Sequence, residues 1–282
     1  ILDSRTRWIM PRFFLLAFLL SLSHTLLAEA TPVKLQIGVE GILNTPAGPI
    51  KRSVLLLHGW NADMNEVGNL YADLAGRLAE RGIASFRISF SGEGARTGYV
   101  VSSTFDSRVG EAEAALQFMQ EKFPKALLGV QGYSLGGLTA MGLVGRYPDT
   151  FKTMVLWTAA AEMRINGDAA YDAAVRKAMK EGSAVYKDWT DITLTREFIS
   201  GFVGVNVESN LALYTGALLT IRGDQDFLPG RDAEWLKLAP TDDKAFILMG
   251  GADHIFHVLD DSKPGYSERL LRSTTNWFDR TL

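Results

Sequence analysis

The chain contains no cysteine among its 282 residues. This absence excludes disulfide bonds and thiolate metal sites, and it also excludes a lipid anchor attached to a cysteine. Cysteine usage normally separates oxidising from reducing compartments, so that information is missing as well. An assignment of the compartment therefore depends on the amino terminus.

An excess of charge of either sign is also lacking. The formal net charge is −3, from 29 basic and 32 acidic residues. Such a balance provides no basic field that would attract the phosphates of nucleic acid. A G-x-x-x-x-G-K-[ST] loop is absent, and Gly92, Gly94 and Gly98 lack the G-x-G-x-x-G spacing of a dinucleotide site. We therefore predict no nucleic-acid partner and no nucleotide cofactor.

Metal-binding residue types gather near the carboxyl end, in the stretch from Asp253 to Asp261. A second group of histidines and aspartates with matching spacing is absent from the sequence. We therefore predict no metal site and no cofactor.

Long apolar runs are scarce, and the clearest one, Phe13 to Leu20, is too short for a span of about 20 residues. Basic residues precede it, and Ala28-Glu29-Ala30 follows as an A-x-A cleavage site. This order predicts a secretory signal peptide over residues 1–30, and hence an exported protein, periplasmic or secreted, with no stable membrane span after cleavage. The alternative is an uncleaved interfacial anchor. Residues 1–9 precede Met10, a plausible start, and are treated as potentially foreign to the natural product.

Residues 31–282 have the size and the 47% hydrophobic content of one domain with a sizeable core. Short β-rich runs alternate with longer helical patterns, which predicts a mostly parallel sheet covered by helices. The expected strands are 53–57, 83–90, 126–131, 151–157, 217–222 and 244–249, and the expected helices include 67–78, 109–123 and 266–278.

The alternation breaks between about residues 161 and 214. This stretch combines aromatic residues and methionines with many charges, which favours a small amphipathic helical cap inserted between two strands. Aromatic side chains bury large apolar areas, so we expect most of them to form the core of the cap and the others to line a pocket.

Gly132-Tyr133-Ser134-Leu135-Gly136 is a G-x-S-x-G pentapeptide. Such a sequence allows a tight strand-to-helix turn that exposes the serine hydroxyl above the sheet. A strand-like run precedes it and a helical run follows it, as the motif requires. Ser134 is therefore the candidate nucleophile.

A serine alcohol needs a neighbouring base. Of the four histidines, His24 lies in the signal segment and His58 follows a buried-type strand ahead of the serine. His254 and His257 remain, and both follow the last predicted strand. We favour His254, because it stands in the loop at the strand end, where α/β folds place their sites.

The third member of a triad orients the histidine and lies between serine and histidine in the chain. Asp224 and Asp226 follow the strand 217–222, and Asp224 could equally cap its own turn. Asp253 adjoins the histidine, so its side chain is poorly placed to face the same ring. Asp226 is the candidate acid.

Five blocks in this order resemble the α/β-hydrolase superfamily: His58-Gly59-Trp60, Phe90-Ser91-Gly92-Glu93-Gly94, Gly132 to Gly137, Gly223-Asp224-Gln225-Asp226 and Gly251-Ala252-Asp253-His254. The branch most similar is that of small-capped carboxylesterases, including cinnamoyl (feruloyl) esterases and serine-aminopeptidase-like hydrolases, over about residues 53–278. The resemblance implies an α/β-hydrolase fold, supports Asp226, and assigns the oxyanion hole to the backbone N–H groups of Trp60 and Leu135, with His58 stabilising a turn. The second block departs from the more usual Arg-Gly-His-Gly, which puts the local loop and the pocket shape in doubt.

We therefore expect a serine carboxylesterase that acts on a small ester with a short-chain or aromatic acyl group, through an acyl-enzyme and without a cofactor. A serine peptidase or thioesterase would use the same triad. A hypothesis of another class is a binding protein on an inactive hydrolase fold; such proteins usually lack one member of the triad. The sequence leaves the oligomeric state undetermined.

Overall fold

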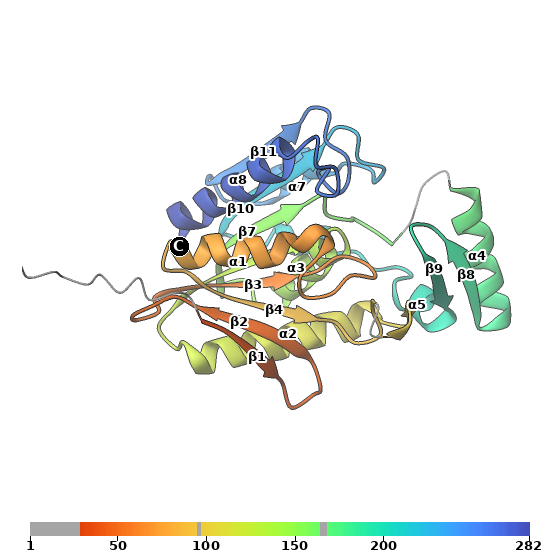
Figure 1. The fold of residues 1–282 in the computed structure, drawn as a ribbon, viewed down its shortest axis with the longest axis horizontal. Helices are drawn as coiled ribbons and strands as arrows, with labels where there is room; N and C mark the ends of the chain where they lie inside the picture. The colour runs from red at the N-terminus through yellow and green to blue at the C-terminus, as the bar shows by residue number, and fades with distance from the viewer. Residues whose placement is uncertain (1–28, 95–96, 164–167) are drawn as a thin grey trace, which may run out of the picture.

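The computed structural model describes residues 29–94, 97–163 and 168–282 (Figure 1). The predicted signal peptide lies outside these ranges, apart from Glu29 and Ala30, which begin the first strand. Among the described helices, none has the length and apolarity that crossing a bilayer requires.

An eight-stranded sheet forms the centre of the molecule, in the order β1-β2-β4-β3-β6-β7-β10-β11. The pairs β1–β2 and β2–β4 are antiparallel, and all the other neighbours are parallel. The strands are β1 (Glu29–Lys34), β2 (Glu40–Thr45), β3 (Arg52–Leu57), β4 (Ala84–Ser89), β6 (Leu127–Tyr133), β7 (Phe151–Trp157), β10 (Ala217–Gly223) and β11 (Lys244–Met249). The six expected strands are confirmed, and a β1–β2 hairpin is added at one edge.

Helices cover both faces of the sheet because its strands are apolar on both sides (Figure 1). Alternate residues of β3 point to opposite faces: Leu55 and Leu57 join one buried cluster, and Val54 and Leu56 join the other. The helices α1 (Leu70–Glu80) and α8 (Gly265–Thr281) pack on the second cluster, and α2 (Phe105–Lys122), α3 (Leu135–Arg146) and α7 (Asp232–Leu238) pack on the first. Because β4, β3, β6, β7, β10 and β11 run parallel, their carboxyl ends lie together at one edge of the sheet.

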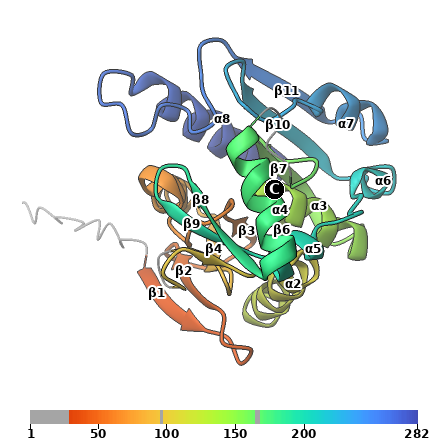
Figure 2. The ribbon, with the colours of Figure 1, turned by 90° about the vertical axis from the view of Figure 1, so that its right-hand side faces the viewer.

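Residues 168–214 form a cap beside this edge (Figure 2). It contains α4 (Ala169–Glu181), β8 (Ser183–Lys187), β9 (Asp191–Thr195), α5 (Arg196–Gly201) and α6 (Glu208–Leu211). The expectation of a purely helical insertion is wrong in one respect, because β8 and β9 form an antiparallel hairpin. Each strand has five residues, too few for the period-two pattern to be distinguished from the helical stretches around it.

The cap is joined to the body by a strand of the body itself. The two residues of β5 (Val100–Val101) pair in parallel with β9 and complete a three-stranded sheet. Thr195 Oγ1 also donates a hydrogen bond of 2.8 Å to the carbonyl oxygen of Val101. The cap is therefore anchored at its hairpin as well as at its two chain connections.

Candidate active site

Ser134 lies in the sharp turn between β6 and α3. Its backbone has φ 51° and ψ −116°, a conformation that non-glycine residues rarely adopt. The turn brings α3 so close to β3 that a Cβ atom on Gly136 would lie 1.9 Å from the carbonyl oxygen of Leu57. The glycine of the motif is thus required by close approach, and the strained turn presents the serine at the strand end.

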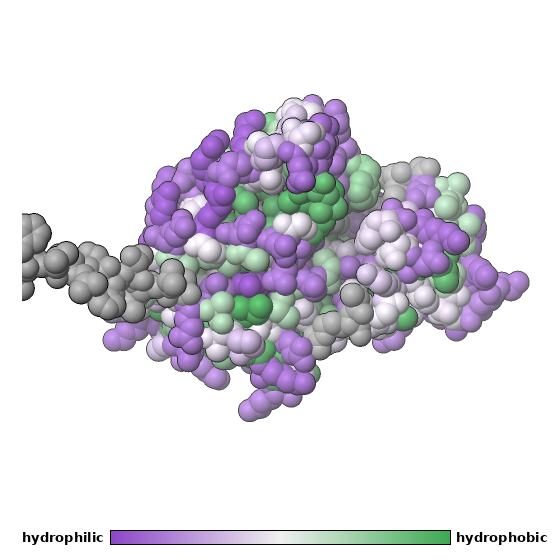
Figure 3. Space-filling view, viewed as in Figure 1, coloured by the Kyte–Doolittle hydropathy of each residue, from purple (hydrophilic) through white to green (hydrophobic). Residues whose placement is uncertain are grey.

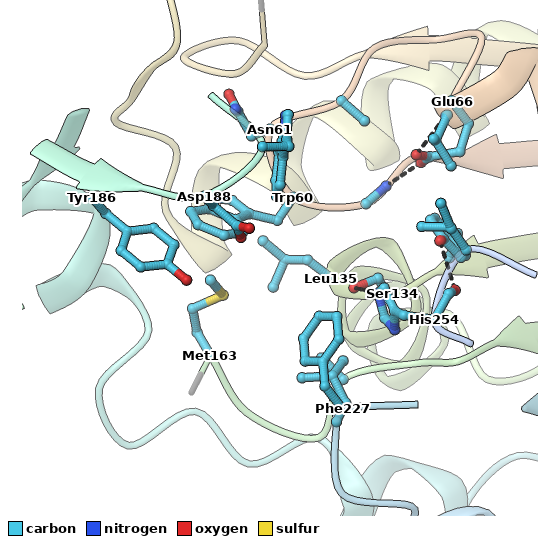
Figure 4. Close-up of a pocket in the computed structure, with 18 of the residues that line it drawn as sticks. Trp60, Asn61, Glu66, Ser134, Leu135, Met163, Tyr186, Asp188, Phe227 and His254 are labelled. Carbon is cyan, nitrogen blue, oxygen red and sulfur yellow. Dashed lines mark hydrogen bonds between the residues drawn. The ribbon is translucent and has the colours of Figure 1, made fainter. Parts of the chain in front are cut away.

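The three candidate residues form one chain of hydrogen bonds, of which Figure 4 shows Ser134 and His254. His254 Nε2 lies 3.1 Å from Ser134 Oγ, and His254 Nδ1 lies 2.7 Å from Asp226 Oδ1. A carboxylate only accepts, so the network assigns the proton to Nδ1 and leaves Nε2 as the acceptor of the serine proton. The structure therefore brings together the residues chosen from the sequence, in the geometry of a nucleophile, a base and an orienting acid.

Asp226 is fixed on both carboxylate oxygens. Its Oδ1 also accepts the N–H of Leu228 at 3.0 Å, and its Oδ2 accepts Arg222 Nη1. The same guanidinium donates to Asp232 Oδ2 at 2.5 Å and to the carbonyl oxygen of Ala159 at 2.6 Å. The sequence reasoning did not identify Arg222 or Asp232; the available signal was an arginine at the end of a strand of buried type, which requires a partner.

The rejected alternatives have other contacts. Asp224 Oδ1 accepts the N–H of Gly251 at 2.6 Å and so ties the two loops together. Asp253 accepts the N–H of His257 at 2.8 Å, and His257 Nε2 lies 2.8 Å from the carbonyl oxygen of Gly251. These residues brace the loop that carries His254.

His58 lies at the start of the loop that carries Trp60. Its Nε2 accepts the N–H of Phe90 at 2.9 Å, and its Nδ1 lies 2.8 Å from the carbonyl oxygen of Gly59, which assigns the proton to Nδ1. Burial, together with the nearby Arg108, holds the pKa of His58 well below its ordinary value. A neutral, fully paired imidazole fits the turn-stabilising role that the resemblance implied.

The two expected oxyanion donors come from the loop after β3 and from the first residue of α3. Leu135 is the first residue of α3, where a backbone N–H has no partner within the helix. The N–H of Trp60 makes no hydrogen bond to any part of the chain that the structure describes. Both N–H groups are thus available to a substrate oxygen.

A cavity of about 1080 Å³ opens between Ser134 and the cap. In Figure 4, Ser134, Leu135 and His254 lie on one side of this cavity, and Tyr186, Asp188 and Met163 lie on the other. On the face seen in Figure 3, hydrophobic residues gather near the centre, whereas the periphery is mostly hydrophilic. The cavity lining includes Trp60, Trp189 and Phe227, so an apolar wall faces Ser134 and His254.

Trp60 connects the loop after β3 with the cap. Its ring stacks on Tyr186 and Phe198 of the cap, with centroids 6.3 and 6.2 Å apart, and meets Trp189 edge-on at 5.7 Å. Most of the cap aromatics are buried, namely Tyr171, Tyr186, Phe198, Phe202 and Tyr214. Tyr186 also lines the cavity, together with the exposed Trp189. The expectation that most of them are buried in the cap and that others line the pocket is confirmed.

No group of three or more acidic, histidine or cysteine side chains that could hold a metal ion occurs within the described ranges. Neighbouring histidines and aspartates, such as His257 and Asp253, instead bond to each other and to backbone.

Comparison with solved structures identifies the fold. The chain is similar to Est1E from Butyrivibrio proteoclasticus in its ferulic acid complex, with a TM-score of 0.68, 15% identity, and coverage of 89% of this chain and 99% of that one. It is also similar to a monoacylglycerol lipase from Paleococcus ferrophilus, with a TM-score of 0.66, 14% identity, and coverage of 90% and 100%. An esterase domain from Rhodothermus marinus gives 0.61 at 19% identity, with coverage of 90% and 98%. The fold is that of the α/β hydrolases.

Curated protein sequences give no match. A family model described as serine aminopeptidase, S33, matches residues 48–197, which include Trp60, Ser134 and Leu135 but end before Asp226 and His254. The match covers more than half of the chain, and the fold agrees with it. The chain belongs to the serine aminopeptidase S33 family, within the α/β-hydrolase superfamily.

Proposed function

We propose that the protein is a serine hydrolase that cleaves carboxylic esters through an acyl-enzyme. The observation that carries the proposal is the hydrogen-bonded chain from Asp226 through His254 to Ser134 at the edge of a large cavity. All three members of the triad are present and aligned, which disfavours an inactive binding protein.

The reaction follows from the contacts. Ser134 Oγ bonds to the ester carbonyl carbon while His254 Nε2 takes its proton, and the carbonyl oxygen becomes an oxyanion held by the N–H groups of Trp60 and Leu135. The bond to the alcohol breaks as His254 gives the proton to the leaving oxygen. Water then adds to the acyl-enzyme, again through His254, and releases the acid and Ser134. Asp226 holds the imidazole in the required tautomer throughout.

We further propose a short-chain or aromatic acyl group as the substrate. Trp60, Trp189 and Phe227 supply aromatic faces around the cavity. The ferulic acid complex of Est1E is an aromatic acid on the same fold, and the likeness supports this class of substrate.

The test is hydrolysis of a panel of p-nitrophenyl acyl esters and methyl hydroxycinnamates, with Ser134→Ala as the control. We expect the variant to fold and to lose activity by about 10⁴-fold or more. Retained activity in the variant would overturn the assignment of Ser134, and the panel ranks acyl length against aromatic acids.

The family description favours one alternative, a serine peptidase on the same triad. Aminoacyl p-nitroanilides and acyl thioesters separate the alternatives from esterases. Turnover of an anilide or a thioester with no ester cleavage, abolished in Ser134→Ala, would replace the ester proposal.

Export remains a proposal, supported by the pattern of residues 1–30. Expression of the chain in a bacterium, followed by amino-terminal sequencing of the protein, tests it. A mature amino terminus near Thr31 is expected, and an intact leader in the cytoplasm would contradict it.

A further inference from the structure

The loop that carries the Trp60 N–H is held on both sides by buried carboxylates. The N–H of Gly59, just before Trp60, donates to Glu66 Oε2 at 2.6 Å. The N–H of Asn61, just after it, donates to Glu93 Oε2 at 2.5 Å. The central N–H, that of Trp60, has no partner in the described chain. Three consecutive amides thus divide into two that are pinned and one that is free.

Glu93 is itself immobilised. Its Oε1 accepts Arg108 Nη1 at 2.5 Å and the hydroxyl of Ser103 at 2.6 Å, and both charged side chains are fully buried. Arg108 Nη2 donates to the carbonyl oxygen of His58 at 2.6 Å. The ion pair therefore fixes the loop at His58 and at Asn61.

Glu66 has a strained backbone and a buried carboxylate. Its backbone has φ 62° and ψ 171°, a region used almost only by glycine that costs about 1–3 kcal/mol. Its two carboxylate oxygens accept the N–H groups of Gly59 and Val67 (Figure 4). No lysine or arginine of the described chain pairs with it, and burial raises its pKa to about 7. Strain and desolvation persist where the surrounding structure imposes them, often at functional sites.

We infer that Glu66 and Glu93 are positioning residues that hold Gly59 and Asn61 so that the N–H of Trp60 points at the developing oxyanion. The inference rests on the proposed function, because it concerns the oxyanion hole of that reaction. Preorganised donors are effective because they need no reorganisation when the charge develops. Neither glutamate contacts the reacting atoms, so their effect should be on the rate of the chemical step.

Glu66→Gln and Glu93→Gln test the inference. In each residue both oxygens accept hydrogen bonds, and an amide nitrogen cannot accept, so each variant loses one acceptor at nearly constant shape. Measured at a pH above the pKa of Glu66 and per active site titrated with a phosphonate, kcat should fall about 10-fold to 100-fold. KM should stay within about twofold, because the lost interaction belongs to the transition state.

Glu111→Gln is the matched control. Glu111 Oε2 accepts the N–H of Ser91 at 2.9 Å, next to the block that contains Glu93, but its bond is exposed and does not reach the loop of Trp60. This variant should keep the wild-type kcat. If the glutamates served only the stability of the fold, their variants would give less folded protein but the same kcat per titrated active site. An unchanged kcat per titrated site in both glutamate variants therefore overturns the inference.

Amide hydrogen exchange provides a readout that is independent of the reaction. The Gly59 amide should exchange faster in Glu66→Gln, and the Asn61 amide faster in Glu93→Gln, with no change in Glu111→Gln. If the wild type cleaves no acyl substrate, the proposed function fails while this measurement still decides whether the glutamates hold the loop. If Glu66→Gln does not fold, Glu66→Asp replaces it, because aspartate keeps the charge but has a shorter reach. Unchanged amide exchange and unchanged kcat in Glu66→Asp would count against the inference.

Discussion

Two buried arginines, Arg222 and Arg108, support the loops of the candidate site with similar sets of contacts. Arg222 holds Asp226 and Asp232 and donates to the carbonyl oxygen of Ala159. Arg108 holds Glu93 and donates to the carbonyl oxygen of His58. In each case one guanidinium joins a strand or helix to a loop that presents a reacting group.

The two regions differ in the balance of charge. On the side of His254, one guanidinium serves two carboxylates, which leaves an excess of negative charge beside the ring that would become positive in the proposed reaction. On the side of Trp60, Arg108 matches Glu93, and the remaining carboxyl, Glu66, has its pKa raised to about 7 by burial. The difference teaches that the carboxylates outnumber the guanidinium beside His254, the base of the proposed reaction, whereas Arg108 and Glu93 are matched one to one beside Trp60.

The largest expected effect comes from removing the negative charge of Asp226, which contacts His254. Asp226→Asn keeps the size of the side chain but removes the charge and allows the wrong tautomer of His254. We expect kcat to fall by about 10³-fold to 10⁴-fold. Steady-state kinetics on the best ester of the panel measure this, and a loss below tenfold would show that the charge on Asp226 is unimportant.

Removal of each arginine is expected to affect stability next. Arg222→Met leaves two carboxylates buried without a cation, and Arg108→Met leaves one. Breaking such pairs costs about 3–5 kcal/mol, and we place Arg222→Met at the upper end and Arg108→Met at the lower end. Urea unfolding gives the two free energies, and the reverse order would break the comparison of charge balance.

The pH dependence of stability sharpens the comparison at Glu66. Its pKa rises from 4.5 to about 7 through burial, in the presence of Asp63, Arg108, Tyr71 and Tyr133 around it. The folded state therefore binds the proton more tightly, so this contribution to stability is complete below pH 4.5 and is lost as the pH rises to about 7.

The free energy of unfolding of Glu66→Gln, relative to the wild type, should accordingly increase over this interval by up to about 3 kcal/mol. Unfolding curves of both proteins across the interval measure the slope, because all other titrations cancel. A constant difference would mean that Glu66 titrates normally.

The smallest effects concern two buried tyrosines that anchor the two loops. Tyr133 donates to the carbonyl oxygen of His254 at 2.9 Å, and Tyr71 donates to that of Leu57 at 2.7 Å. Tyr133→Phe and Tyr71→Phe should each lower the free energy of unfolding by about 1 kcal/mol. Thermal unfolding compares them, with similar losses expected because each variant removes one neutral hydrogen bond.

The sequence was sufficient for the sheet and for the order of the triad, because both depend on local patterns. Continuous apolar runs specify buried parallel strands, and the glycines around Ser134 specify the turn. The edge hairpin was missed, since β1 is largely exposed and has a weak apolar pattern. Local patterns therefore placed Ser134, Asp226 and His254 at the correct strand ends.

The supporting groups could not be predicted in the same way. Arg108 reaches Glu93 and His58, 15 and 50 positions earlier in the chain, from a helix, and Arg222 meets Asp232 across a loop. Such pairs depend on how elements pack, and no spacing encodes them. The strained backbone of Glu66 is equally unpredictable, because a glutamate carries no local signal for a glycine-like conformation.

The strand β5 has a consequence for exchanging caps between relatives. Its two residues lie more than eighty positions before the hairpin with which they pair, in a connection of the body. An exchange of residues 168–214 alone would leave the transplanted hairpin with an unpaired edge and the recipient with a strand that has lost its neighbour. A chimaera that exchanges only residues 168–214 should therefore misfold or aggregate. A chimaera that also exchanges the segment around Val100 should keep its three-stranded cap sheet and fold.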